Sequence, residues 1–462
     1  MKVLFDIIVV GSGPAGLSAA ITANEFGLKV LVIDEQSEIG GQVYKSIGKN
    51  LDRRKTFLGE DYFNGKKLYE KFLSSKIEYW LNTSVWQINE NKEVCFKRNE
   101  KTGIIKANFI IICGGAYERP MPITGWTLPG VMTVGAAQTL LKTSSVGADN
   151  SIFIGSGPLF YLTVYQYLKA GFKVKSVIDT TKSKQMVFAL PYFLFAILRI
   201  DLILKGMFWM KYISKHTRVF KRPKKISILG LEKAESVAIT LSGERLVKLE
   251  SNNIFLHQGV IPNINLTMAT GIKHHWNQLQ RCWVPTLSNN GETSIDGIYV
   301  AGDNGEIGGV NVATLSGQIA SLDILQKLKK LVGLRKYFLF FKLIREKALR
   351  PFLDKLFQPD KTTLIPDNKE EIVCRCENIK RVELEESIEL GISGPNQLKS
   401  YSRAGMGNCQ GRMCGLTVQS MIAIKQNRSL SEVGYYRLRP PIKPITIKEL
   451  SSLEEYSLDE GE

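Results

Sequence analysis

Four cysteines in the C-terminal part of the chain have the spacing of a metal site. They form a Cys-x-Cys pair and a Cys-x4-Cys pair, and they are Cys374, Cys376, Cys409 and Cys414. Four thiolates arranged in this way can hold either zinc or an iron–sulfur cluster, and the spacing alone does not separate the two. Neighbouring arginines would lower the pKa of the thiols and offset the charge of a cluster; these are Arg375, Arg403 and Arg412. The sequence therefore predicts a thiolate site in this region.

A glycine turn near the N-terminus has the pattern of a dinucleotide-binding site. The apolar run from Ile7 to Val10 predicts a buried strand, and Gly-Ser-Gly-Pro-Ala-Gly leads from it into a helix. The first glycine permits the tight turn, the second lets a pyrophosphate approach the backbone, and the third lets the helix lie close to the strand. The phosphates would then meet the helix N-terminus. The candidate residues are Gly11, Gly13, Pro14, Ala15 and Gly16.

An acid follows the second predicted strand. The apolar run from Val30 to Ile33 ends at Asp34, which lies at the distance from the glycine turn where an acid accepts the ribose hydroxyls of an adenine nucleotide. Glu35 is the alternative for this role. The strand, turn, helix, second strand and acid together favour a dinucleotide site over a chance glycine turn.

Three further segments identify the dinucleotide. Gly41 and Gln42, after the second strand, would bring backbone near the pyrophosphate, although a surface turn is the alternative. Two later strands also end in glycines. These candidates are Gly41, Gln42, Gly114, Gly302, Asp303 and Ala313. In flavoproteins with two dinucleotide-binding folds, an acid placed like Asp303 binds the ribityl chain, and the following helix dipole stabilises the reduced flavin. These matches favour FAD over NAD at the first site.

A second glycine turn occurs at Gly155-Ser-Gly157, but its third glycine position holds Phe160. A bulky side chain there would push the helix off the strand and alter the phosphate site. The next strand ends at Asp179, which would repel a 2′-phosphate and so favours NAD or an adenosine nucleotide such as ATP or ADP over NADP. The alternative is a fold that has kept its shape without a ligand.

The composition indicates a multidomain globular protein of a reducing compartment. The chain has 462 residues with 44% hydrophobic and 23% charged content, and three of its seven cysteines are isolated. Its net charge of +17 comes without a nucleic-acid-binding module, so an acidic partner subunit or an anionic membrane surface explains the charge better. No signal peptide is recognised. We expect a cytoplasmic location, with peripheral contact at the inner face of the membrane as the alternative.

Two apolar segments bear on that alternative. Residues 182–225 are basic and apolar, with an uncharged run that is too short to span a bilayer and is interrupted by Pro191. We expect helices packed on the domain, and contact with a membrane surface or partner is the minority interpretation. Residues 334–350 form a basic amphipathic segment, which we expect to cover the chain's own core.

The elements predict an α/β fold with two Rossmann-like dinucleotide-binding domains and a small cysteine domain. Segments around residues 79–86, 94–98 and 103–106 suggest a small meander, followed by a separate buried strand from Phe109. The predicted divisions are residues 1–120 (FAD-binding domain, first part), 121–285 (second nucleotide-binding domain), 286–330 (return to the first domain), 331–370 (helical linker), 371–428 (cysteine domain) and 429–462 (extended tail).

Nearly the whole chain resembles one component of the multi-subunit flavin-dependent amino-acid dehydrogenases. The similar components are the opine oxidase A subunit, the hydrogen cyanide synthase B subunit, and the alpha subunits of dye-linked proline and hydroxyproline dehydrogenases. The resemblance rests on the two glycine turns and on Gly114-Gly-Ala-Tyr-Glu-Arg-Pro120, Gly125-Trp-Thr-Leu-Pro-Gly-Val-Met132, Ala301-Gly-Asp303, Val373-Cys-Arg-Cys-Glu377 and Ala404-Gly-Met-Gly-Asn-Cys-Gln-Gly-Arg-Met-Cys-Gly415.

The resemblance implies a disulfide-reductase-like flavoprotein fold whose four cysteines ligate a [2Fe-2S] cluster of the bacterioferritin-associated-ferredoxin type. It also implies that Phe160 is ordinary, since such subunits often lack the third glycine of the second fold. The amine substrate would be oxidised at a flavin in a different, catalytic flavoprotein subunit, and an FMN at the subunit interface fits the same scheme. The partners would thus be a hetero-oligomeric complex and no nucleic acid.

We therefore expect an FAD-dependent oxidoreductase subunit that relays electrons between its flavin and the cluster. The complex would oxidise the C–N bond of an amino acid or opine to an imine. One alternative is a stand-alone NADH-dependent flavoprotein reductase, and another is a non-catalytic scaffold subunit. The sequence identifies no general acid or base, so the catalytic residues are left unassigned.

Overall fold

The computed structural model describes residues 3–49, 55–360 and 363–456, and one large sheet forms the centre of its first fold. The strand order is β3-β2-β1-β6-β5-β4, and β19 and β22 also pair with β6. Ile7, Ile8 and Val9 are fully buried, as expected for a strand covered on both faces. The strands are β1 (Val3–Val10), β2 (Val30–Ile33), β3 (Glu78–Trp80), β4 (Ser84–Ile88), β5 (Glu93–Arg98), β6 (Lys101–Ile112), β19 (Ile298–Val300) and β22 (Glu454–Glu455).

The strand β6 corrects the predicted meander. The segments expected as a short strand at 103–106 and a separate strand from Phe109 are one continuous strand of 12 residues. Its first half pairs antiparallel with β5, and its second half pairs parallel with β1 and β19. One long strand therefore joins the meander to the parallel core, and the intervening Lys106 and Ala107 continue the ladder rather than turn.

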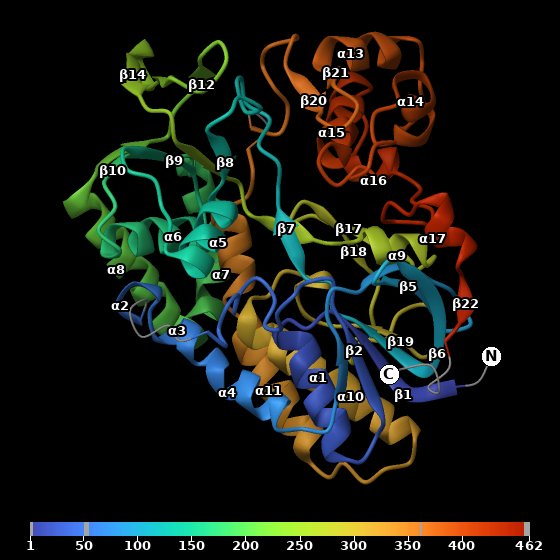
Figure 1. The fold of residues 1–462 in the computed structure, drawn as a ribbon. Coiled ribbons are helices and arrows are strands. Elements are labelled where there is room, and N and C mark those ends of the chain that lie inside the picture. The colour runs from blue at the N-terminus through green and yellow to red at the C-terminus, as the bar shows by residue number, and fades with distance from the viewer. Residues whose placement is uncertain (1–2, 50–54, 361–362, 457–462) are drawn as a thin grey trace.

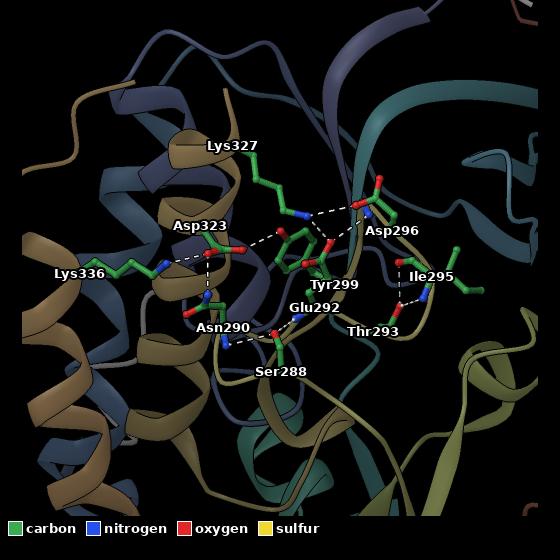
Figure 2. Close-up of polar contacts among 11 residues, drawn as sticks. Ser288, Asn290, Glu292, Thr293, Ile295, Asp296, Tyr299, Asp323, Lys327 and Lys336 are labelled. Carbon is green, nitrogen blue, oxygen red and sulfur yellow. Dashed lines mark hydrogen bonds and ion pairs between the residues drawn. The ribbon is translucent and has the colours of Figure 1, made fainter. Parts of the chain in front are cut away.

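Helices α1 (Pro14–Glu25) and α10 (Val310–Lys327) pack against each other along one face of this sheet (Figure 1). Side-chain contacts fix α10 beside β19, as Figure 2 shows. Asp323 of α10 accepts hydrogen bonds from Tyr299 Oη (2.8 Å), Asn290 Nδ2 (2.6 Å) and Lys336 Nζ (2.6 Å). The buried carboxylate is thereby well paired, which holds the C-terminal half of α10 against the strand.

The second fold is a parallel sheet in the order β11-β10-β9-β15-β8, accompanied by an antiparallel sheet β12-β13-β14. The antiparallel pair β7 (Ala116–Glu118) and β16 (Val260–Pro262) connects the two folds. The remaining elements here are β8 (Val131–Thr133), α5 (Val134–Ser144), β9 (Ser151–Gly155), α6 (Pro158–Lys169), β10 (Val174–Asp179), β11 (Arg218–Lys221), β12 (Lys225–Leu229), β13 (Ser236–Thr240), η3 (Ser242–Glu244), β14 (Leu246–Glu250) and β15 (Ile254–His257).

Residues 182–225 contain the expected helices. Helix α7 (Ser183–Ala196) packs on α12 (Arg350–Leu356), η2 (Ile197–Arg199) follows, and α8 (Ile200–His216) packs on α6. Helix α11 (Arg335–Lys347) lies on α10 and touches η2. By length and composition, Ser183–His216 is the one helical segment of the described chain apolar enough to cross a membrane, but its helix breaks at Arg199, where φ is −131° and ψ is 43°.

The cysteine region forms a small unit with its own core, at the upper right of Figure 1. Leu384, Leu398, Val418 and Ile422 are fully buried there. The elements are β20 (Ile372–Cys374), β21 (Ile379–Lys380), α13 (Arg381–Glu389), α14 (Pro395–Ser402), α15 (Gly415–Lys425) and α16 (Leu430–Val433).

The tail after residue 429 is not simply extended. It contains α16 and α17 (Ile447–Ser451), both begun by a capping box, and ends in β22 on the first sheet. The sequence carries these signals at Ser429 and Glu432 and at Thr446 and Glu449, which the extended interpretation overlooked. The other elements are α2 (Lys55–Leu58), α3 (Glu60–Phe63), α4 (Gly65–Leu73), α9 (Asn265–Ala269), β17 (His274–Asn277), β18 (Cys282–Pro285) and η4 (Gly302–Asn304).

Candidate functional site

A cavity of about 890 Å³ lies where the two folds meet. It opens at the carboxyl ends of the parallel strands of the first sheet, where α/β folds bind their ligands. Most of the predicted nucleotide residues line it: Gly11, Gly13, Pro14, Ala15, Asp34, Glu35, Gly41, Gln42, Gly114, Gly157, Gly302, Asp303 and Ala313. Gly16, Gly155 and Asp179 are not among the lining residues.

The first glycine turn has the close packing that a pyrophosphate cradle needs. A Cβ atom at Gly16 would lie 1.9 Å from the carbonyl oxygen of Gly11, and one at Gly41 would lie 2.9 Å from the Cα of Gly13. A side chain at Gly16 would push α1 away from the turn, and one at Gly41 would crowd the second glycine of the turn. The residues present therefore fit a dinucleotide, and Gly41 lies beside the turn rather than on a remote surface loop.

Asp34 holds the glycine turn as well as lining the cavity. Its Oδ2 accepts hydrogen bonds from the backbone N–H and the hydroxyl of Ser12, both at 2.6 Å, and its Oδ1 accepts from the N–H of Gln36 at 2.8 Å. Each carboxylate oxygen has two lone pairs, so Oδ1 keeps acceptor capacity for a ribose hydroxyl. Glu35 instead pairs with Lys443 at 2.5 Å, which brings the C-terminal tail to this end of the cavity.

Asp303 anchors the loop that opens α10. Its Oδ1 accepts the backbone N–H groups of Gly308 (2.8 Å) and Gly309 (2.9 Å). The cavity reaches the first turn of the helix at Gly309, Val310 and Ala313. The positive end of the α10 dipole therefore faces the cavity, as the sequence predicts.

The second glycine turn keeps its backbone geometry. Gly155 has a φ of +151°, and a Cβ atom there would lie 2.1 Å from the carbonyl oxygen of His257. Phe160 is fully buried and packs edge-on against Phe153 in the core of the second fold. The Phe160 ring is therefore accommodated by packing within the aromatic core of the second fold.

Asp179 is occupied by protein groups. Its Oδ2 accepts from the Tyr161 hydroxyl at 2.9 Å, and its Oδ1 accepts from the Thr181 N–H at 2.9 Å. Asp179 lies outside the large cavity, whereas Gly157 and Pro158 of the same glycine turn line it.

Sequence reasoning missed a buried acid–histidine pair in the cavity wall. His257 Nδ1 lies 2.6 Å from Glu118 Oε1, and Glu118 Oε2 accepts the backbone N–H of Gly135 at 2.7 Å. Both side chains line the cavity. The one available signal was that His257 ends a strand and Glu118 stands in a conspicuous Gly-Gly-Ala-Tyr-Glu-Arg-Pro block.

Lys142 is a second residue that the sequence did not reveal. Its Nζ donates to the carbonyl oxygens of Gln42 (3.2 Å) and Val43 (3.1 Å), across from α5 to the loop after β2. Burial lowers the pKa of this lysine to about 8. The cavity therefore carries a cation that titrates close to neutral pH.

The structure brings the four predicted thiols close together. Cys374 and Cys414 are buried in the same small core, and the backbone at Gly407 lies against Cys376. Interaction with Cys414 and with backbone N–H groups of Gly405, Glu377 and Cys376 lowers the pKa of Cys374 to about 6, and interaction with Cys374 together with burial raises the pKa of Cys414. Across residues 3–49, 55–360 and 363–456, no group of three or more His, Cys, Asp or Glu side chains has the arrangement of a metal-ion site.

The neighbouring arginines are engaged elsewhere rather than at the thiols. Arg403 pairs with Glu377 at 2.8 Å, and Arg375 stacks over the Trp126 ring, 5.4 Å from its centroid. Arg412 donates to the carbonyl oxygen of Cys409 and lines the cavity. The low pKa of the Cys374 thiol comes mainly from S–H and N–H donors, which corrects the expectation that arginines cause it.

Comparisons with known proteins agree with this architecture. Residues 5–178 match the pyridine nucleotide-disulphide oxidoreductase family, and residues 368–452 match the sarcosine oxidase A3 domain. The A subunit of opine oxidase from Agrobacterium tumefaciens (strain Ach5) is 39% identical over 97% of this chain and 92% of its own length. The HcnB subunit of hydrogen cyanide synthase from Pseudomonas protegens is 27% identical over 95% of this chain and 96% of its own length.

Solved structures share the fold. The L-proline dehydrogenase of P. horikoshii has a TM-score of 0.72 at 19% identity, covering 96% of this chain and 79% of its own. The thioredoxin reductase of T. acidophilum has a TM-score of 0.52 at 17% identity, covering 71% and 99%. The disulphide-oxidoreductase family implies FAD binding, which the glycine cradle fits. The chain belongs to the family of opine oxidase A subunits and is a subunit of a flavin-dependent oxidoreductase.

Proposed function

We propose that this chain relays electrons between FAD, bound in the large cavity, and a [2Fe-2S] cluster held by Cys374, Cys376, Cys409 and Cys414. The relay would serve a complex that oxidises the C–N bond of an amino acid or opine to an imine at a separate catalytic flavoprotein subunit. The observation that carries this proposal is that the fold brings the four thiols of two separate segments together, with Cys374 and Cys414 in one buried core and Cys376 close to Cys409.

The thiol arrangement suits a two-iron cluster. Such a cluster needs two thiolates on each of its two irons, and four thiols supply that number. Backbone N–H groups also point at the sulfurs: those of Gly405 and Glu377 at Cys374, and those of Gly411 and Met413 at Cys409. Hydrogen bonds of this kind stabilise thiolate charge and tune a cluster's potential.

The cysteine unit is fixed against the two nucleotide folds. Trp126 Nε1 donates to the carbonyl oxygen of Ile372 at 2.8 Å, and Glu371 accepts the N–H of Gly125 at 3.0 Å. On the other side, Asn265 Nδ2 donates to the carbonyl oxygens of Cys409 (3.4 Å) and Gln410 (3.3 Å). Asn265 also lines the cavity, so one residue touches both the flavin cavity and the cysteine loop. A short separation between the two redox sites is what a relay requires.

In the cavity, FAD would supply the redox chemistry, and the chain supplies binding and electrostatics. The cradle formed by Gly11, Gly13 and Gly41 would receive the pyrophosphate, and the N-terminus of α10 would favour negative charge at its end of the cavity. For the second fold we propose NAD or an adenosine nucleotide such as ATP or ADP, and for the subunit interface an FMN.

Anaerobic purification of the chain tests the proposal. We expect bound FAD, about two irons and two labile sulfides for each FAD, and the absorption spectrum of a [2Fe-2S] protein. Zinc in place of iron would refute the relay and leave a structural role for the cysteine unit. Rapid bleaching of the flavin by NADH in the isolated chain would instead support the stand-alone reductase, since electrons would then enter without the catalytic subunit.

A further inference from the structure

Two neighbouring helical segments expose an unusual amount of apolar surface. On the α7–α8 hairpin, Leu190, Leu194 and Leu204 are 65%, 71% and 59% exposed. On α11, Phe338 and Phe341 are 64% and 72% exposed. Single exposed apolar side chains are ordinary, but contiguous patches of this kind mark a binding surface.

The two segments form one surface. Arg199, at the break between α7 and α8, has a side chain that is only 7% exposed and bonds Glu346 of α11 as well as Asp201 (2.8 Å). Packing of η2 against α11 accompanies this ion pair. Because the buried guanidinium bridges both segments, the hairpin tip is held against α11, and both segments expose apolar side chains. The expectation that residues 334–350 only cover the chain's own core is therefore incomplete.

The edge of this surface is basic. Its exposed cations include Lys184, Lys211, Lys215, Lys342 and Arg345, and Lys347 is exposed but pairs with Glu306 at 3.4 Å. The two acids within these helices, Asp201 and Glu346, are engaged by Arg199. An apolar face rimmed by cations matches the chemistry of an anionic lipid surface, where side chains enter the acyl boundary and cations meet headgroups.

We propose that the α7–α8 hairpin and α11 attach this protein to the surface of an anionic membrane. The segment does not span the bilayer, because the break at Arg199 and the packing of α7 on α12 and α8 on α6 keep both helices on the fold. A protein partner fits less well, since the hairpin tip from Leu194 to Leu198 offers only apolar side chains, whereas protein interfaces carry about one hydrogen bond per 100–200 Å². The cysteine unit lies at the other end of the molecule from α11 (Figure 1), which leaves it accessible to a redox partner.

Vesicle sedimentation tests the attachment. The purified full chain should sediment with vesicles of phosphatidylglycerol and phosphatidylcholine in equal parts, and much less with phosphatidylcholine alone or at high salt. The triple variant Lys342→Gln/Arg345→Gln/Lys347→Gln should bind the anionic vesicles about 100-fold more weakly, since each cation near the surface contributes about 1 kcal/mol. The double variant Leu194→Ser/Phe195→Ser should lose roughly tenfold or more, because apolar area no longer leaves water.

A matched control is Leu231→Ser/Leu246→Ser, which removes two side chains that are 92% and 70% exposed at the antiparallel sheet. It should bind vesicles as the wild type does. Equal sedimentation with anionic and neutral vesicles, or unchanged binding by both surface variants, would overturn the proposal. A third outcome would also overturn it: the wild type fails to bind vesicles, and the Leu194→Ser/Phe195→Ser variant loses the catalytic subunit. That result would assign the surface to the catalytic subunit. FAD content and cluster content should be the same in all variants, so this test is independent of the proposed relay.

Discussion

Gly317 lies in the middle of α10, and replacing it by alanine would separate the two helices that frame the dinucleotide cradle. A Cβ atom at Gly317 would lie 2.1 Å from the carbonyl oxygen of Ala15, in the first turn of α1. Non-bonded heavy atoms settle at about 3.5 Å, so the helices would have to part by roughly 1 Å. The obstacle is a backbone atom, and no side-chain rotation relieves it.

The free-energy cost of Gly317→Ala follows from two opposing effects. Alanine in place of glycine inside a helix gains about 1 kcal/mol, whereas overpacking costs about 1–3 kcal/mol. A rigid contact this short places the cost at the upper end, for a net loss of about 2 kcal/mol. Because Ala15 belongs to the cradle, the loss should fall on the flavin-bound state, and 2 kcal/mol corresponds to about a 30-fold rise in the Kd for FAD.

Flavin per chain after gel filtration, together with the Tm, measures this effect. The control is Gly206→Ala in α8, where a Cβ atom would meet nothing within 4 Å and should raise stability slightly. If Gly317→Ala keeps wild-type flavin content and Tm while Gly206→Ala behaves as expected, close approach of α10 to α1 is not what holds the cradle.

Three further predictions concern the thiols, the buried lysine and the acid–histidine pair. Cys409→Ser should remove iron and sulfide but leave FAD bound, because the cysteine unit shares no cradle residue; parallel loss of flavin would contradict this. Burial lowers the pKa of Lys142 from 10.5 to about 8, so the unfolded chain binds more protons between these values and wild-type stability rises with pH across that window, a rise that Lys142→Met should lack. The Tm of the wild type relative to the variant should therefore increase from pH 8 to 10.5, and a constant difference would show that the lysine is not charged at a cost. Glu118→Ala should lower the Tm, since it strips the buried Gly135 N–H and His257 Nδ1 of their partner at about 1–3 kcal/mol each; an unchanged Tm would mean that water replaces the carboxylate.

Local sequence patterns predicted most of the first fold. Gly11 to Gly16, Asp34 and Asp303 could be placed because each role depends on a short stretch: a strand, a turn and the residue at a strand end. Asp179 followed the same rule, yet its carboxylate is taken by Tyr161 and Thr181. The local sequence does not show which protein groups will hydrogen-bond the carboxylate at a strand end.

Contacts between distant segments could not be predicted in the same way. The pair Glu118 and His257 exists because β7 pairs antiparallel with β16, which follows soon after His257 at the end of β15, and this pairing is a property of the whole topology. The single strand β6 was divided in two since Lys106 and Asn108 interrupt its apolar run, although only one of its ends lies in the parallel core. Periodicity cannot describe a strand whose two halves have different neighbours.

The pairing of β22 with β6 has a consequence for biosynthesis. Glu454 and Glu455 complete the sheet beside Gly103 and Ile104, and Lys443 reaches Glu35, so the N-terminal fold is finished by residues that are translated after the second fold and the cysteine unit. At about 5–20 residues per second, a ribosome takes roughly 20–70 s to cover the interval. During that time the nascent chain carries an uncovered strand edge, and β19 and α10 are also missing for most of it. The complete sheet of the first fold can therefore form only after the second fold and the cysteine unit have been synthesised.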